Sequence, residues 1–383
     1  MSKKEMSKTS NISVVRFTDA IEKMDENLKA ISSGGKKVFG YFCTYTPIEM
    51  IHAAGFLPVR IAGGQGRVDN ADSLTPNFIC PYVRLATERA LMGRYDYLSG
   101  VIEGYTCDVV CGAVNVWEDN FKGELYHTIP LPYDNYPADR DFFGAVLEEL
   151  KDKLEGVGGA VTEESLEVSL DLYGKIRGMI LRFMEMREKR SLPLTAAEFL
   201  TVIRAGFVTP PEDYLLMLEG LAGEIEEKGD KAETINRKGI PVLVSGSLVE
   251  EPGVLEILEE SGGVVVADDL CTGFRNFHPE GGEGKTSTER LIDRYINRYP
   301  CPSRSRTGVR VPRLVELVKS SGAKGVVFLF QKFCSPHLAD HPVAVEMLKK
   351  EGIPQIAIEM EETGIMEGQL RTRLEGFFEM IGS

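Results

Sequence analysis

The sequence predicts an α/β fold with two flavodoxin-like parallel-sheet lobes joined by a helical connector. Short apolar runs, bounded by glycine, proline or polar turns, alternate with helical segments in two separate series. This alternation is typical of βαβ units, in which right-handed crossovers place helices on both faces of a parallel sheet. The 383 residues also exceed what one ordinary core needs, which favours two domains.

In the first series a helix at 16–31 precedes four expected strands, at 37–42, 58–62, 98–104 and 125–131. The helices between these strands are expected at 47–54, 79–93 and 108–119. The second series predicts strands at 241–247, 262–270, 325–333 and 354–361. Its helices are expected at 253–261, 287–297, 309–321, 338–351 and 366–381.

From 139 to about 230 the strand-like runs disappear, and the residues are rich in Leu, Met, Glu and Lys. This stretch predicts a helical connector. The domain organisation is therefore an N-terminal lobe at 1–138, a connector at 139–235 and a C-terminal lobe at 236–383. We expect the carboxyl ends of both sets of strands to face a shared cleft, with the connector helices outside it.

The charge pattern excludes several classes of partner. The net charge of -14 is spread along the chain with no block of Lys or Arg, which argues against a nucleic-acid or acidic-membrane surface. The start MSKKEMSKTSN is polar, and no run approaches the roughly 20 apolar residues of a membrane span. We expect a cytoplasmic protein whose seven cysteines are thiols, ligands or redox groups rather than a disulfide framework.

The positions of the cysteines indicate a binding site, because ligands bind at the carboxyl ends of strands in an open parallel sheet. The cysteines that follow an expected strand are Cys43, Cys107, Cys271 and Cys334, and two more precede a proline in a loop, Cys80 and Cys301. Zinc prefers paired C-x2-C or C-x-x-H spacings, which are absent. Dispersed thiolates from several loops fit an iron-sulfur cluster better.

Other interpretations of these cysteines stay open. Each one taken alone is equally consistent with a small buried hydrophobe. A nucleophilic cysteine with a histidine base is a further alternative, although no single cysteine stands out. Cys111 lies one helical turn after Cys107, and we interpret it as core packing.

Glu49 is the candidate catalytic carboxylate. It follows Cys43 by six residues in CTYTPIE, where Pro47 can start a helix and place Glu49 in its first turn. A carboxylate beside a metal-binding loop can transfer protons, provided that it reaches the substrate. The alternative is a solvated glutamate that only complements the helix dipole.

Several segments together carry a family resemblance: FGYFCTYTPIEMIHAAGFLPVRI, NFICPYVR, EGYTCDVVCGAVNVW, DDLCTGFR, YPCPSRSR and FLFQKFCSPHLADHP. They resemble the 2-hydroxyacyl-CoA dehydratase superfamily. That group includes the D-component type subunits of 2-hydroxyglutaryl-CoA dehydratase, the cluster-binding subunits of benzoyl-CoA reductase and the double-cubane cluster proteins. The resemblance covers nearly the whole chain and is weakest in the connector.

The resemblance implies a cluster-binding subunit that receives single electrons from a separate ATP-hydrolysing iron-sulfur activator. In dehydratases of this type the electron enters the thioester carbonyl of an acyl-CoA substrate. The resulting ketyl radical expels the 2-hydroxyl group, and a base removes a β-proton, which the radical has acidified. The electron is then recycled. The active form is expected to be a homodimer or a heterodimer with a related subunit.

The number of cysteines leaves the cofactor open. Dehydratase subunits of this kind use three cysteines for one 4Fe-4S cubane, whereas double-cubane members use six. All six positions are filled here, so a double-cubane or benzoyl-CoA reductase-type subunit and a non-catalytic electron-transfer subunit are the alternatives. In the single-cubane case we expect Cys43, Cys107 and Cys334 to meet in the cleft, with sulfurs roughly 6 to 7 Å apart.

Overall fold

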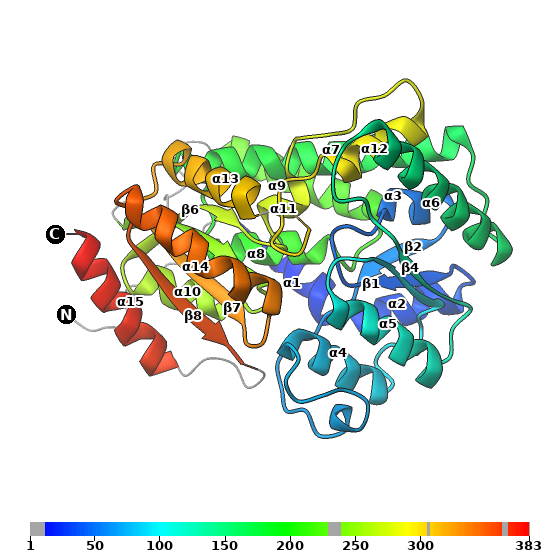
Figure 1. Ribbon diagram of the computed structural model, residues 1–383, viewed down its shortest axis with the longest axis horizontal. Helices are drawn as coiled ribbons and strands as arrows, with labels where there is room; N and C mark the ends of the chain where they lie inside the picture. Colours follow the sequence, from blue (N-terminus) through cyan, green and yellow to red (C-terminus); the bar gives the residue numbers. More distant parts are fainter. Residues whose placement is uncertain (1–11, 229–238, 305–306, 362–366, 383) are drawn as a thin grey trace.

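The computed structural model describes residues 12–228, 239–304, 307–361 and 367–382. Its strands form two four-stranded parallel sheets, with the orders β2-β1-β3-β4 and β6-β5-β7-β8 (Figure 1). The first sheet consists of β1 (Val38–Tyr41), β2 (Leu57–Arg60), β3 (Gly100–Gly104) and β4 (Leu125–Ile129). The second consists of β5 (Ile240–Gly246), β6 (Gly263–Asp269), β7 (Gly325–Gln331) and β8 (Gln355–Met360). The predicted fold class is confirmed.

The helices follow the expected segments with small shifts. The N-terminal lobe contains α1 (Val15–Glu22), α2 (Met24–Ser33), α3 (Ile48–Ala53), the 3-10 turn η1 (Ala71–Ser73), α4 (Pro81–Leu91) and α5 (Asp108–Asn120). The connector contains α6 (Pro137–Gly156), α7 (Glu163–Glu188), α8 (Ala196–Ala205) and α9 (Pro211–Lys228). The C-terminal lobe contains α10 (Gly253–Glu260), α11 (Phe274–Phe277), α12 (Ser287–Ile296), α13 (Thr307–Ser320), α14 (Ser335–Lys350) and α15 (Glu367–Gly382). The single helix expected at 16–31 is divided at Lys23.

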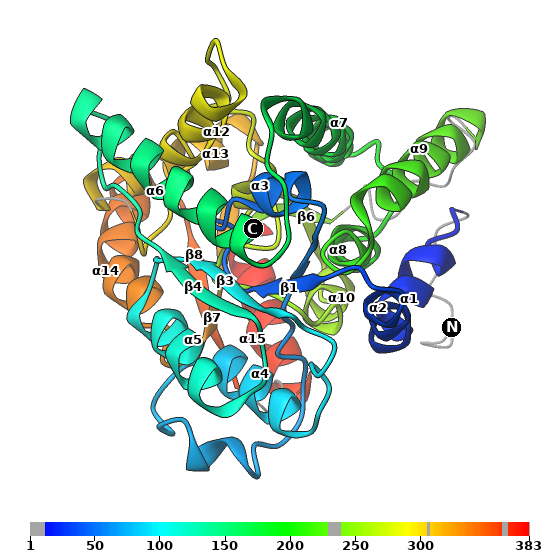
Figure 2. The same ribbon diagram turned by 90° about the vertical axis from the view of Figure 1, so that its right-hand side faces the viewer.

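Both faces of each sheet are buried, which explains why the strands are continuous apolar runs. Val38 and Phe39 are adjacent on β1, yet they belong to different hydrophobic clusters because successive side chains point to opposite faces. Figure 2 shows α4 and α5 on one side of the N-terminal sheet and α3 and α6 on the other. Val326 and Val327 alternate in the same way in the C-terminal sheet.

The strand order defines where a ligand is expected. In each sheet the order reverses between two central strands, β1 and β3 in one and β5 and β7 in the other. The crevice outside the carboxyl ends of such strands is the usual binding position in this architecture. Gly104 ends β3 directly under the loop after β1, where a Cβ atom would lie 2.6 Å from the Tyr45 carbonyl oxygen. The loop that carries Cys43 therefore packs against the end of β3.

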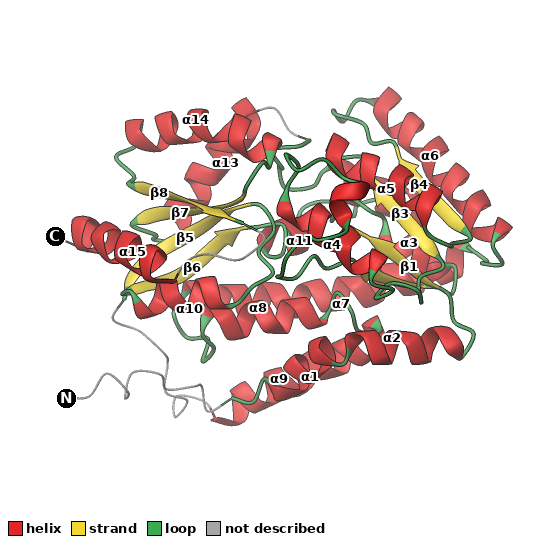
Figure 3. Cartoon of the chain, turned by 90° about the horizontal axis from the view of Figure 1, so that it is seen from below, coloured by secondary structure: helices red, strands yellow, loops and turns green. Residues whose placement is uncertain are grey.

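The connector joins the lobes by contact with both. Helix α7 packs against α3 of the N-terminal lobe and against β6 of the C-terminal sheet, and Figure 3 shows α7 and α8 running along both sheets. Helix α12 of the C-terminal lobe also contacts the connector, because Leu291 and Tyr295 belong to the same hydrophobic cluster as Phe143 of α6. The predicted boundary at 138/139 lies just inside α6, and the boundary at 235/236 lies outside the described residues. None of the described helices is long and apolar enough to span a bilayer.

One buried carboxyl at the junction of connector and C-terminal lobe gives a pH prediction. Glu259 of α10 accepts a hydrogen bond from the backbone N–H of Ala196 at 3.0 Å, and burial raises its pKa to about 7. A raised carboxyl pKa means that the folded state binds more protons than the unfolded state between roughly pH 4.5 and 7, so this contribution to stability is lost as pH rises. We expect Glu259→Gln to remove part of that decline, at most about 1.4 kcal/mol per pH unit. Urea unfolding from pH 5 to 8 checks this, and identical pH slopes for both proteins would contradict it.

Candidate functional site

The six candidate ligand cysteines lie on loops from both lobes. Three of them occupy the N-cap position of a helix: Cys80 of α4, Cys107 of α5 and Cys334 of α14. Cys43 and Cys271 follow β1 and β6, and the buried Cys301 follows α12. An N-cap thiol faces the positive end of the helix dipole, which favours the thiolate that binds metal.

The structure brings these six thiols into one electrostatically coupled group. Burial, followed by the nearby Cys80 thiol, raises the pKa of Cys334 to about 12, and Cys271 and Cys301 also contribute. Burial raises the pKa of Cys43 to about 12, with contributions from Glu103, Cys301 and Cys271. The pKa of Cys107 is raised by burial and by Cys80, Cys43 and Cys334.

Cys111 stands apart from this group. Burial and Glu103 raise its pKa to about 12, and none of the six other thiols contributes. Its side chain is buried, which agrees with the interpretation of Cys111 as core packing.

The spacing of the thiols differs from that of a mononuclear site. Within the described residues, no three His, Cys, Asp or Glu side chains stand close enough to share one metal ion. A cubane makes a different demand, because each cysteine binds a separate corner of the cluster. Several partly buried thiols, drawn from helix N-termini and strand ends of both lobes, fit such a group. The predicted separation of roughly 6 to 7 Å stays a prediction.

Two buried arginines hold the cysteine loops together. Arg60 of β2 donates to the Phe42 carbonyl at 2.9 Å and to the Cys271 carbonyl at 3.1 Å, so it joins the two lobes. Arg275 of α11 places Nη1 3.9 Å from Cys301 Sγ. Burial raises the pKa of Cys271, and the Arg275 guanidinium opposes part of this increase.

The Glu103 side chain, at the end of β3, is hydrogen-bonded to the backbone of the Cys43 loop. Its Oε2 atom accepts hydrogen bonds from the backbone N–H of Phe42 at 2.7 Å and of Cys43 at 3.1 Å. Burial raises the Glu103 pKa to about 7, and these hydrogen bonds oppose part of the increase. The carboxyl therefore fixes the turn that carries a candidate ligand.

Glu49 lies in the first turn of α3, as predicted, but it is buried rather than solvated. Arg177 Nη1 is 3.0 Å from Glu49 Oε1, and the Tyr295 hydroxyl is 2.7 Å from Oε2. Burial alone would raise the Glu49 pKa, but Arg177 and the Tyr295 hydrogen bond lower it below its usual range. Glu49 is thus an ionised carboxylate at neutral pH, held by a cation and a phenol.

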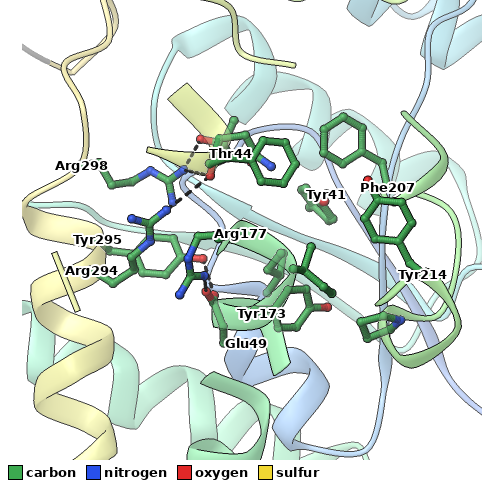
Figure 4. A pocket seen from close by; sticks show the side chains of 16 residues that line it. Tyr41, Thr44, Glu49, Tyr173, Arg177, Phe207, Tyr214, Arg294, Tyr295 and Arg298 are labelled. Atoms are coloured by element: carbon green, nitrogen blue, oxygen red, sulfur yellow. Dashed lines mark hydrogen bonds and ion pairs between the residues drawn. The ribbon is translucent and has the colours of Figure 1, made fainter. Parts of the chain in front are cut away.

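A pocket of about 550 Å³, measured with its open mouth, surrounds Glu49 (Figure 4). Thr44, the residue after Cys43, lines it together with Arg298, which lies three residues before Cys301. The pocket therefore adjoins the cysteine loops. The remaining lining residues are Tyr41, Ile48, Tyr173, Ile176, Arg177, Gly206, Phe207, Pro211, Tyr214, Asn276, Phe277, Arg294 and Tyr295.

The expectation that the connector lies outside the cleft was wrong. Tyr173 and Arg177 of α7, together with Phe207 and Tyr214 around the start of α9, form part of the pocket wall. The physical reason is that α7 packs against both lobes, so its inner face covers the gap between them. No local pattern indicated this, because Arg177 lies in a helix with charged residues on several sides.

Other arginines of the site were also missed. Arg294 and Arg298 are four residues apart around Tyr295, and both are buried. Arg294 belongs to α12, which ends at Ile296, and Arg298 lies just after the helix. The sequence did contain a signal for these two residues. Two arginines lie within seven residues before Cys301, in RYINRYPCP, and could have been recognised as part of the site.

Known proteins resemble this chain over almost its whole length. The family model described as 2-hydroxyglutaryl-CoA dehydratase, D-component, matches residues 43–381. The β subunit of (R)-phenyllactyl-CoA dehydratase from Clostridium sporogenes is 26% identical, over 95% of this chain and 97% of that protein. The C subunit of benzoyl-CoA reductase from Thauera aromatica is 26% identical, over 90% and 91%. The β subunit of lactoyl-CoA dehydratase from Anaerotignum propionicum is 28% identical, over 91% and 92%. The chain therefore belongs to the 2-hydroxyglutaryl-CoA dehydratase D-component family, a family of enzyme subunits.

Proposed function

We propose that this chain is the iron-sulfur subunit of a 2-hydroxyacyl-CoA dehydratase-like enzyme that removes water from a 2-hydroxyacyl thioester by a ketyl-radical route. The observation that supports this most is the position of a buried, ionised Glu49 in a pocket that adjoins six coupled thiols. The residues that would hold the cluster are Cys43, Cys107 and Cys334 for one 4Fe-4S cubane, joined by Cys80, Cys271 and Cys301 for a double cubane. The cluster would supply single electrons at low potential.

Proton transfer is the part of the reaction that we assign to this chain's own side chains. Glu49 accepts the β-proton, either directly or through the Tyr295 hydroxyl, which is 2.7 Å from its carboxylate. General acid-base groups work within about 2.6 to 3.2 Å of the proton that they move. The Arg177 guanidinium keeps Glu49 ionised before the substrate arrives, at the cost of some basicity. The aromatic wall of Tyr173, Phe207 and Tyr214 would limit the access of water.

A double-cubane or benzoyl-CoA reductase-type subunit is the second candidate. The coupling of all six thiols, rather than three, favours it. A non-catalytic electron-transfer subunit would need the cysteines alone, and the pocket beside them weighs against that role. For either type of enzyme we propose an ATP-dependent activator as electron donor, and for the dehydratase an acyl-CoA as substrate. The names of the relatives as β or C subunits support a partner subunit.

Iron and sulfide content per chain tests the cofactor proposal. After anaerobic purification we expect about four irons for the dehydratase-like subunit and about eight for the double cubane. Cys107→Ser is expected to lose most of the iron, because it removes a thiolate ligand. Cys111→Ser is the matched control, since Cys111 lies one turn away on the same helix and outside the coupled group, and it should keep the iron. Equal iron in the two variants would remove Cys107 from the ligand set.

A further inference from the structure

The pocket beside Glu49 carries more positive than negative charge. Three arginines line it, Arg177, Arg294 and Arg298, against a single acid, Glu49. Arg177 and Glu49 form an ion pair and offset each other. Throughout the described residues no carboxylate lies within ion-pair distance of Arg294 or Arg298. Two buried guanidiniums are therefore left without a counter-charge, which is an unfavourable arrangement unless a ligand supplies one.

The hydrogen bonds of these two arginines fix their positions without neutralising them. Arg294 Nη1 donates to the carbonyls of His278 and Glu280, each at 2.7 Å. Arg298 Nη2 donates to Thr44 Oγ1 at 2.8 Å, and its guanidinium stacks over the Tyr45 and Tyr295 rings. The Nε atom of each arginine is buried and has no partner within the described chain. Arg294 and Arg298 are only 2% and 9% exposed, so each guanidinium is largely removed from bulk water.

The opposite wall of the pocket is apolar. Figure 4 shows Phe207 and Tyr214 across the pocket from Arg294 and Arg298, with Tyr173 between them and the Glu49 side. Ile48, Ile176 and Phe277 add aliphatic and aromatic surface. A bare inorganic anion would leave this wall uncovered. A ligand with a short hydrocarbon chain and an anionic end would contact both the apolar wall and the arginines. Ligand pockets commonly combine apolar walls with a few polar groups that fix the orientation of the ligand.

We propose that this pocket binds an organic carboxylate, with its anionic end at Arg294 and Arg298 and its hydrocarbon part against Phe207 and Tyr214. The carboxylate either belongs to a small free acid or stands at the end of an acyl chain. The second source rests on the proposed function, and it would make Arg294 and Arg298 the residues that select a charged acyl group over a neutral one. Glu49 opposes this only in part, because the Arg177 ion pair offsets much of its charge.

Binding of butyrate and butyramide to the anaerobically purified protein tests the site without an activator or thioester. The two ligands have nearly the same shape, and only butyrate is charged. We expect butyrate to bind about 10-fold more tightly, the effect of a charge-assisted hydrogen bond, in ligand-observed NMR titrations. Arg298→Gln and Arg294→Gln should lose this preference. Arg313→Gln is the matched control, because Arg313 pairs with Glu280 outside the pocket lining, and it should keep the preference.

If an arginine variant does not fold, a variant that removes a negative charge from the pocket still tests the proposal. Glu49→Gln removes the negative charge of the pocket, so butyrate should bind several-fold more tightly and butyramide should be unaffected. Equal affinity for butyrate and butyramide in the natural protein would overturn the proposal. So would inorganic phosphate binding as tightly as butyrate, because the apolar wall would then have no role.

Separate experiments distinguish the two sources of the carboxylate, a free acid or the end of an acyl chain, and they also separate this proposal from the dehydratase proposal. Butyrate binding without turnover of any 2-hydroxyacyl thioester would support the site and contradict the proposed function. Turnover that is at least about 10-fold faster for an acyl chain with a terminal carboxylate, and that loses this preference in Arg298→Gln, would support the acyl source. Equal turnover of charged and neutral acyl chains would overturn that source.

Discussion

Glu49→Gln is expected to reduce turnover by about 100-fold or more while leaving the iron content and the reduction of the cluster unchanged. Gln keeps the size of the side chain, and its carbonyl oxygen can still accept from Arg177, which is 3.0 Å from the carboxylate. Its NH2 group can only donate, to the Tyr295 hydroxyl oxygen that lies 2.7 Å from the carboxylate. It cannot accept the β-proton. No other carboxylate lines the pocket among the described residues, so none can take over the role of Glu49.

The measurements are steady-state turnover with an activator, iron content, and the spectrum of the reduced protein. Glu212→Gln is a control from the same region, since Glu212 pairs with His52 on the surface and lies outside the pocket lining; it should keep full activity. Arg177 loses its ionic partner in Glu49→Gln, so we also expect a loss of stability on the order of 1 to 3 kcal/mol. Full activity in Glu49→Gln would show that the carboxylate serves only to pair with Arg177. Loss of iron together with activity would make its role structural.

Asp269→Ala is expected to destabilise the C-terminal lobe by about 3 to 5 kcal/mol. Asp269 Oδ2 is 2.6 Å from Arg310 Nη2, and Oδ1 is 3.3 Å from Arg275 Nε. Arg310 also pairs with Asp340, so two acids balance two bases in a network that is almost inaccessible to solvent. Removal of one carboxylate leaves a buried positive charge, which the interior stabilises poorly.

Urea unfolding of the variant measures this loss. Glu260→Ala is the control, because Glu260 pairs with Arg371 on the surface with half of its side chain exposed, and such pairs contribute about 0.2 to 1 kcal/mol. A loss below about 1 kcal/mol in Asp269→Ala would contradict the assigned role of the network. Arg275 also faces Cys301, so under the proposed function the variant is expected to hold iron less firmly than the natural protein.

The fold could be predicted from the sequence because six of the described strands are buried along nearly their whole length. Runs such as VVFLFQ and KVFGYF are apolar at nearly every position, and glycine or proline limits their length, so strands and helices could be distinguished without tertiary information. The same pattern placed Cys43, Cys107, Cys271 and Cys334 at strand ends, and the structure couples their thiols. The break at Lys23 was missed, because the residues on both sides of it favour a helix.

The pocket could not be predicted in the same way. A cysteine after a strand has its position set by local chain geometry, because all strands of a parallel sheet end at one edge. Arg177 meets Glu49 across 128 residues, and Tyr295 meets it across 246, through packing of α7 against α3 and of α12 against α7. The sequence by itself determined the two parallel sheets and the candidate ligands. Only the tertiary structure decided that Glu49 is a paired, buried carboxylate in an arginine-rich pocket, because its pKa and surroundings depend on side chains that no local pattern relates to it.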